Sequence, residues 1–292
     1  LARCVPPFDL ERLVPMANPR GLDPTGRYLT LAAASALSHA EVTVRGALRD
    51  RAGLFVGTCR LSPANTREFY DSIEKRGLWR VSATASAGIV LNAPAGACSR
   101  LLSLRGPSTT LSALSASGLL ALVHAADFLS RHDEADLMVA GGVDEVDGTD
   151  KRADRDGAGL LVLATEAVAA SRPAVHVAGY GLAGPNQLGQ AVAQALAMAE
   201  LGAEKPDLLC GSAEEIAACE DPTVRALCAA ADVHLDPAAV LGPVLASGSA
   251  LAAVAALCRL KNAQGRIALV VAASPSTASC AMILRREEVH AS

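Results

Sequence analysis

Short apolar runs alternate with helical segments along the whole of this 292-residue chain. Strands are expected at 53–57, 109–111, 137–140, 160–163, 174–180, 206–210, 267–273 and 280–284. Helices are expected between them at 24–38, 62–77, 119–129, 186–201, 223–231 and 247–263. Because the strand runs are apolar on both faces, they are typical of sheets covered by helices on both sides. The pattern therefore predicts an α/β fold in layers.

Residues 106–122 combine a Gly-Pro start, a short strand, a turn of small residues and an apolar helix. This layout is that of a nucleophile elbow, which exposes one side chain at the N-terminus of a helix. Such a place lowers the pKa of a thiol and helps to bind an oxyanion. The residue at the turn is Ser115, and the stretch contains no cysteine. A strand followed by a packing helix without any chemistry remains the alternative for the stretch alone.

The stretch resembles the active-site segment of the β-ketoacyl synthases, the condensing enzymes of the thiolase-like fold. Gly106, Pro107, Ser117 and Gly118 match the family pattern, and Ser115 stands where the family has its cysteine nucleophile. Further segments similar to the family lie at 8–9, 22–34, 92–96, 135–143 and 156–163. The resemblance implies a five-layer αβαβα fold of two similar halves, 1–170 and 171–292, without the N-terminal strand of the family.

The family also uses two histidines, and this chain lacks both at the matching places. Ala213 lies near the first of these positions and Pro243 at the second, and neither side chain can transfer a proton. A serine needs a base to act as a nucleophile, so no catalytic residue is expected. The alternative is an acyltransferase or thioesterase on the same fold, in which Ser115 would be activated by Glu214 or His124.

A condensing-enzyme fold without its chemistry most resembles the chain-length factor, or KSβ subunit, of type II polyketide synthases. The resemblance implies a heterodimer with a catalytic ketosynthase, in which this chain shapes the tunnel that holds an acyl chain carried by an acyl carrier protein. The residues expected at the tunnel wall are Arg60, Ala64, Asn65 and Phe69, and those expected near the interface are Asn92 and Ser99. An ordinary amphipathic surface helix remains the alternative for the first group.

Charge and cysteine usage restrict the other classes of function. The net charge is −4 without a basic run, which argues against nucleic acid and anionic membranes as partners. No run of 18 uncharged apolar residues or apolar leader is evident, so we expect a cytoplasmic protein. The eight cysteines form no C-x-x-C pair, and neither a metal nor a cofactor is expected. The aspartate-rich stretch 144–156 is expected to be a solvated loop.

Overall fold

Two β-sheets organise the chain in the computed structural model, which describes residues 5–14, 22–60, 62–81, 83–146, 155–169, 175–201 and 204–287. The first sheet has the order β2-β1-β3-β4, formed by β1 (Ala52–Gly57), β2 (Ser108–Leu111), β3 (Leu137–Asp144) and β4 (Gly157–Ala164). The second has the order β5-β9-β8-β6-β7, formed by β5 (Val175–Ala183), β6 (Leu208–Cys210), β7 (Val233–Leu235), β8 (Ile267–Ala273) and β9 (Ser279–Arg286).

The two sheets repeat one pairing pattern. In the first, β1 runs parallel to both β2 and β3, and β4 pairs antiparallel with β3. In the second, β6 runs parallel to both β7 and β8, and β9 pairs antiparallel with β8. Only β5, which pairs antiparallel with β9, has no counterpart among the described strands of the first sheet. The two sheets are therefore two copies of one supersecondary arrangement.

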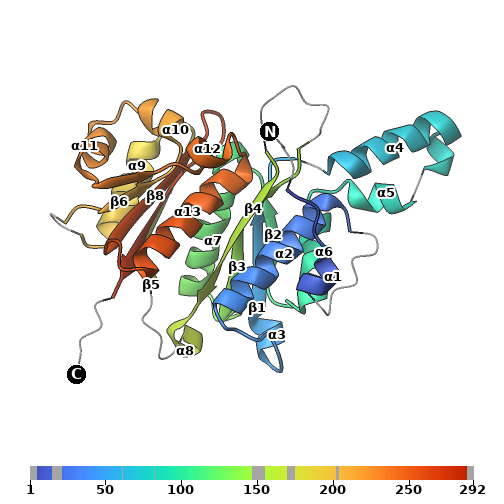
Figure 1. The fold of residues 1–292 in the computed structure, drawn as a ribbon, viewed down its shortest axis with the longest axis horizontal. Coiled ribbons are helices and arrows are strands. Elements are labelled where there is room, and N and C mark those ends of the chain that lie inside the picture. Colours follow the sequence, from blue (N-terminus) through green and yellow to red (C-terminus); the bar gives the residue numbers. More distant parts are fainter. Residues whose placement is uncertain are drawn as a thin grey trace.

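Helices fill the space between the sheets and cover both outer faces, which gives five layers (Figure 1). Helices α2 (Pro24–His39) and α6 (Ala93–Leu102) cover the first sheet, and α9 (Leu188–Met198) covers the second, with α11 (Pro222–Ala230) packed against α9. Between the sheets lie α7 (Ser117–Arg131) and α13 (Ala246–Lys261). The layered α/β arrangement predicted from the apolar runs is confirmed.

Small residues allow the two central helices to approach the sheets closely. A Cβ atom added at Gly118 of α7 or at Gly142 of β3 would overlap the carbonyl oxygen of Ala246, the first residue of α13. Only glycine permits this separation, so the N-terminus of α13 lies against both elements. This packing brings the start of α13 to the same end of the molecule as the start of α7.

The remaining helices are short, except for one in an arm that projects from the body of the molecule. The arm consists of α4 (Pro63–Arg76), η1 (Leu78–Arg80) and α5 (Ala83–Gly88), and lies at the right of Figure 1. The others are α1 (Leu10–Leu13), α3 (Leu48–Arg51), η2 (Leu114–Ala116), α8 (Glu166–Ala169), α10 (Ala213–Ala217) and α12 (Pro237–Leu241). The expected cap of α2 is present, since Asp23 accepts a 2.7 Å hydrogen bond from the backbone N–H of Gly26.

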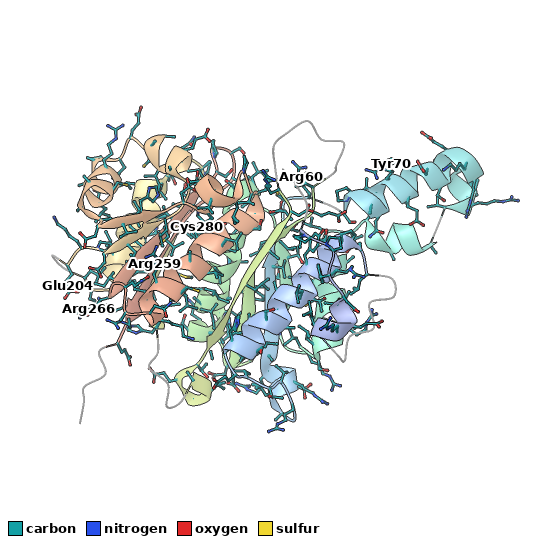
Figure 2. The ribbon with its side chains drawn as sticks, in the orientation of Figure 1. Arg60, Tyr70, Glu204, Arg259, Arg266 and Cys280 are labelled. Atoms are coloured by element: carbon teal, nitrogen blue, oxygen red, sulfur yellow. The ribbon has the colours of Figure 1, made fainter. Side chains whose placement is uncertain are left out.

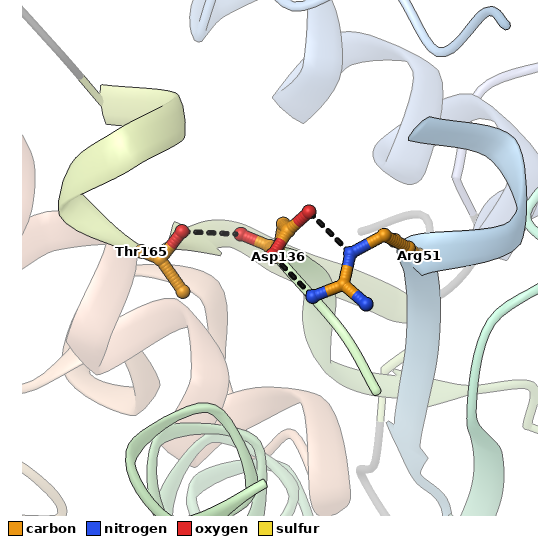
Figure 3. Close-up of polar contacts among 3 residues, drawn as sticks. All are labelled: Arg51, Asp136 and Thr165. Atoms are coloured by element: carbon orange, nitrogen blue, oxygen red, sulfur yellow. Dashed lines mark hydrogen bonds and ion pairs between the residues drawn. The ribbon is translucent and has the colours of Figure 1, made fainter. Parts of the chain in front are cut away.

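Polar contacts hold the strands of the first sheet together at the end where its parallel strands begin. Arg51 donates from Nε and Nη2 to both carboxylate oxygens of Asp136, at 2.5 and 2.7 Å (Figure 3). The backbone N–H of Thr165 donates to the carbonyl oxygen of Asp136 at 3.0 Å. Arg51 precedes β1, Asp136 precedes β3 and Thr165 follows β4, so this cluster aligns the three strands.

Two expectations from the sequence are wrong in detail. The strand predicted at 109–111 is half-exposed rather than buried, because β2 has a partner on only one side among the described strands. Asp144 and Glu145 are not solvated, because β3 extends to Asp144 and both side chains are buried by α2, α4 and α13. The predicted loop residues 147–154 lie outside the described part of the chain.

Candidate functional site

The elbow around Ser115 is a strained turn between β2 and α7. Leu114 has a φ of 52°, in the left-handed region that a branched residue occupies only at a cost of about 1–3 kcal/mol. The hydroxyl of Ser117 holds the turn, since it accepts from the N–H of Ala113 at 2.8 Å and donates to the carbonyl of Leu114 at 2.6 Å. The turn places Ser115 within η2, immediately before the N-terminus of α7.

Three further elements meet the half-buried Ser115. Ser249 of α13 donates from its hydroxyl to the backbone carbonyl of Ser115 at 2.8 Å. The Ser115 hydroxyl lies 3.4 Å from the carbonyl oxygen of Ala273, the last residue of β8. Glu215 of α10 accepts a 2.9 Å hydrogen bond from the N–H of the same residue, Ala273. The end of β8 and the helices α10 and α13 therefore converge on this serine.

The surroundings of Ser115 disfavour negative charge. Burial raises the pKa of the Glu215 carboxyl, although hydrogen bonds from Ala273 and Ser115 oppose the shift. Asp236 and Glu214 raise the same pKa further by charge repulsion. Burial, reinforced by the Glu215 charge, raises the pKa of the nearby Cys280 thiol to about 12. The site thus holds acidic and neutral groups around the serine.

At the two positions predicted to match the histidines of the family, the structure shows hydrogen bonds of the backbone. The N–H of Ala213 donates to Asp236 at 3.0 Å, and the carbonyl of Pro243 accepts from the N–H of Arg155 at 2.8 Å. The described histidines lie elsewhere, namely His39 in α2, His124 in α7, His132 after α7, His176 in β5 and His234 in β7. His124 follows Ser115 along the helix by roughly 13 Å, too far to act as its base.

The bases predicted for Ser115, Glu214 and His124, do not lie beside it. Glu214 is exposed, and the carboxyl group bonded to the end of β8 next to the serine belongs to Glu215. The signal for this choice was weak, because both glutamates lie in the first turn of α10. The orientation of α10 alone determines that Glu214 is exposed and that Glu215 points to the end of β8.

A second group of carboxylates, which the sequence analysis missed, is buried beside the site. Asp144 accepts from the N–H of Ser247 in α13 at 2.7 Å and from the Cys59 thiol at 3.3 Å, and burial raises its pKa to about 6. Glu145 accepts from Thr25 at 2.8 Å and from Ser62 at 3.2 Å. The sequence offers little signal for this pair, because the strand predicted at 137–140 ends four residues before Asp144. These bonds fix α2, α4 and α13 relative to the end of β3.

The residues predicted for a tunnel wall lie along or beside the projecting arm. Figure 2 shows Tyr70 on the arm and Arg60 where the arm joins the body. Ala64 is exposed on α4, and Phe69 packs edge-on against Tyr70 with ring centres 5.7 Å apart. Asn65 is committed to the fold, since its amide donates to Asp23 and to the carbonyl of Gly88 at 2.8 and 3.3 Å.

The two residues predicted for an interface lie on or beside α6, next to the open edge of β2. Asn92 lines a cavity of about 450 Å³ together with Leu91, Gly96, Ser108, Thr109 and Thr110. Ser99 lies on the same helix, and the structure shows no hydrogen-bond partner for its buried hydroxyl or for that of Thr110. A buried hydroxyl without a partner is uncommon, so these two hydroxyls distinguish the contact between α6 and β2 from the rest of the described core.

The part of the chain that the structure describes gives no support for a metal site or for a membrane-spanning helix. No cluster of three or more histidine, cysteine, aspartate or glutamate side chains there is arranged to hold a metal ion. Similarly, none of the helices described has the length and apolarity needed to span a bilayer.

A comparison with models of protein families identifies the family of this chain. Residues 7–184 match the model of the β-ketoacyl synthase N-terminal domain. The chain is a member of the β-ketoacyl synthase family. A search of curated proteins found no match. The matched residues include the elbow, and the assignment of Ser115 to the nucleophile position of the family stays a prediction from residues 106–118.

Similar solved structures confirm the thiolase-like fold of this β-ketoacyl synthase homologue. The ishigamide ketosynthase/chain length factor superposes with a TM-score of 0.80 at 19% identity, over 98% of this chain and 87% of the other. A type II ketosynthase in complex with its acyl-carrier protein, AntDE:AntF, gives 0.80 at 16%, over 98% and 90%. A β-ketoacyl synthase from Burkholderia phymatum gives 0.75 at 18%, over 98% and 88%. At these identities the likeness establishes the fold alone.

Proposed function

We propose that this chain is a non-catalytic, ketosynthase-like subunit, a chain-length factor, of a type II polyketide synthase or a related polyene or fatty-acyl system. Condensation with decarboxylation needs a thiolate to hold the acyl chain and imidazoles to polarise the malonyl group. Serine, alanine and proline stand at 115, 213 and 243 in a site whose elbow geometry is kept. That combined replacement is the observation that carries the proposal.

The proposed partner is a catalytic ketosynthase, which completes this chain in a heterodimer and receives an acyl chain from an acyl carrier protein. Open strand edges and large exposed apolar side chains are features of interaction surfaces. The edge of β2 has both the adjoining cavity and the unpartnered hydroxyls of Ser99 and Thr110. The arm carries Trp79, which is 97% exposed, and Tyr70, which is 61% exposed. Together these surfaces support an assembly larger than one chain.

Assembly is tested by co-expression with a candidate catalytic ketosynthase, followed by size-exclusion chromatography. We expect a 1:1 complex, and we expect Trp79→Ser to weaken it, since a buried tryptophan is among the strongest contributors to protein interfaces. Met198→Ser is the matched control, because Met198 is also exposed but lies on α9 in the outer layer of the second sheet. A stable homodimer that does not exchange with any ketosynthase would count against the proposal.

Two variants test the proposed absence of catalysis and the proposed role of α4 in the tunnel wall. Ser115→Ala should leave the condensation rate of the complex nearly unchanged, whereas a hundredfold loss would favour the alternative, an acyltransferase or thioesterase that uses Ser115. Ala64→Trp should shorten the product if α4 borders the tunnel, and Ala64 is exposed, so the fold tolerates the change. Ala229→Trp, at an exposed position of α11, is the control. Unaltered product length in an intact complex would remove α4 from the tunnel wall.

A further inference from the structure

The two glutamates that begin α10 differ in their surroundings although they are adjacent in the chain. Glu214 is exposed, whereas Glu215 is half-buried and bonded to the end of β8. The backbone of Ala273 binds both partners of the pair, because its N–H donates to Glu215 at 2.9 Å and its carbonyl lies 3.4 Å from the Ser115 hydroxyl. The side chain of Ser115 is close enough to lower the pKa of the Glu215 carboxyl, against the effect of burial. The carboxyl group of Glu215 and the side chain at position 115 are therefore both held against the backbone of Ala273.

A charge in this place acts against acyl transfer. A nucleophile must reach an anionic form, and the carbonyl oxygen of the substrate becomes negative in the transition state. Two like charges a few ångströms apart repel strongly in a partly desolvated site. The other titratable groups that act on Glu215 or are acted on by it, Asp236, Glu214 and Cys280, supply no positive charge. Nothing in this set offsets the carboxylate.

We propose that Glu215 is an electrostatic lock, which keeps position 115 from acting as an acyl-transfer nucleophile even when a thiol is restored there. This effect of Glu215 is proposed only for the surroundings of Ser115 in this chain. It goes beyond the proposed subunit role, since it assigns the lack of chemistry to a residue that is present as well as to residues that are absent. The loss of activity is then maintained twice, once by the absence of a thiol and imidazoles and once by the presence of the carboxylate.

The test compares thiol reactivity at position 115 with and without the charge, in the full chain. Ser115→Cys is prepared alone and combined with Glu215→Gln, which keeps the size of the side chain and its bond from Ala273. Ser115→Cys with Glu214→Gln is the matched control for an exposed charge one residue away. Iodoacetamide alkylation at pH 7.5 is followed by mass spectrometry of the tryptic peptide 106–131, in which residue 115 is the sole cysteine.

We expect the rate at residue 115 to rise at least tenfold with Glu215→Gln and less than twofold with Glu214→Gln. A tenfold change corresponds to one unit in the pKa of the thiol. Equal rates with and without the Glu215 charge, or an equal rise with Glu214→Gln, would overturn the lock. If Glu215→Gln prevents folding, as judged by circular dichroism, Glu215→Ala replaces it, with the same outcomes.

A second measurement separates a lock from a catalytic base. A fluorophosphonate probe is incubated with the chain as it occurs naturally, and peptide 106–131 is examined for a label on Ser115. A lock predicts no label. Labelling that disappears with Glu215→Gln would show that Glu215 activates the serine and would overturn the inference. Neither result depends on complex formation, so failure of the lock is distinguishable from failure of the proposed heterodimer.

Discussion

Replacing Asp144 with asparagine is expected to stabilise the chain at neutral pH and to have no such effect in acid. The Asp144 side chain is completely buried at the end of β3, and its carboxylate accepts from the Ser247 N–H and the Cys59 thiol. Asparagine has the shape of the protonated acid. Its Oδ1 can accept from Ser247 while its amide donates to the Cys59 sulfur, so both contacts survive the substitution.

The magnitude follows from the pKa of Asp144, which burial raises from an ordinary value of 3.8 to about 6. Two units of pKa, at about 1.4 kcal/mol each, correspond to ~3 kcal/mol. Because the folded state binds the proton more tightly than the unfolded state, the natural chain loses stability as the pH rises from about 4 to about 6. Above that range the loss is complete and constant. Asparagine never ionises, so Asp144→Asn should be more stable by up to ~3 kcal/mol at pH 8 and about equal at pH 4.

Urea unfolding at several values between pH 4 and pH 8 measures this difference. Far-ultraviolet circular dichroism is the suitable probe, because the single tryptophan, Trp79, is 97% exposed and its fluorescence would report little of the core. Asp50→Asn, at an exposed position of α3, controls for the loss of one negative charge. A stability difference that stays constant across this range, or a variant that is less stable at pH 8, would refute the assigned burial of the charge.

Three further substitutions test the packing that positions the site, each by the same unfolding assay. Gly118→Ala should lower the free energy of unfolding by about 1–3 kcal/mol, because its Cβ would overlap the backbone of α13. Gly96→Ala, which meets open space on α6, is the control and should raise the free energy of unfolding by up to about 1 kcal/mol. Equal effects would contradict the close approach of the helices. Ser62→Ala should cost about 1–2 kcal/mol through the lost cap of α4, and an unchanged midpoint would show that the cap contributes nothing. Asp136→Asn should lower stability at neutral pH only. The Arg51 guanidinium lowers the pKa of Asp136, and the stability that this ion pair contributes disappears as the pH falls below 3.8. An effect that does not depend on pH would exclude the ion pair.

Much of the fold was predictable from local patterns. Strand runs that are apolar on both faces indicated sheets covered by helices, and the capping residue Asp23 marked the start of α2. The elbow at 106–118 carried the family resemblance, and the residues at 115, 213 and 243 are the basis for predicting that the usual chemistry is missing. These signals are local because periodicity and capping depend on residues a few positions apart.

The surroundings of the site depended on tertiary structure. Asp144 is buried because α13, about 100 residues later in the chain, places the N–H of Ser247 over it. Glu215 rather than Glu214 faces Ser115 because the end of β8 supplies an N–H to only one of them. By itself, the sequence determined the layers and the elbow. Only the packing of distant segments determined which carboxylates are desolvated, because burial and charge interactions depend on neighbours in space.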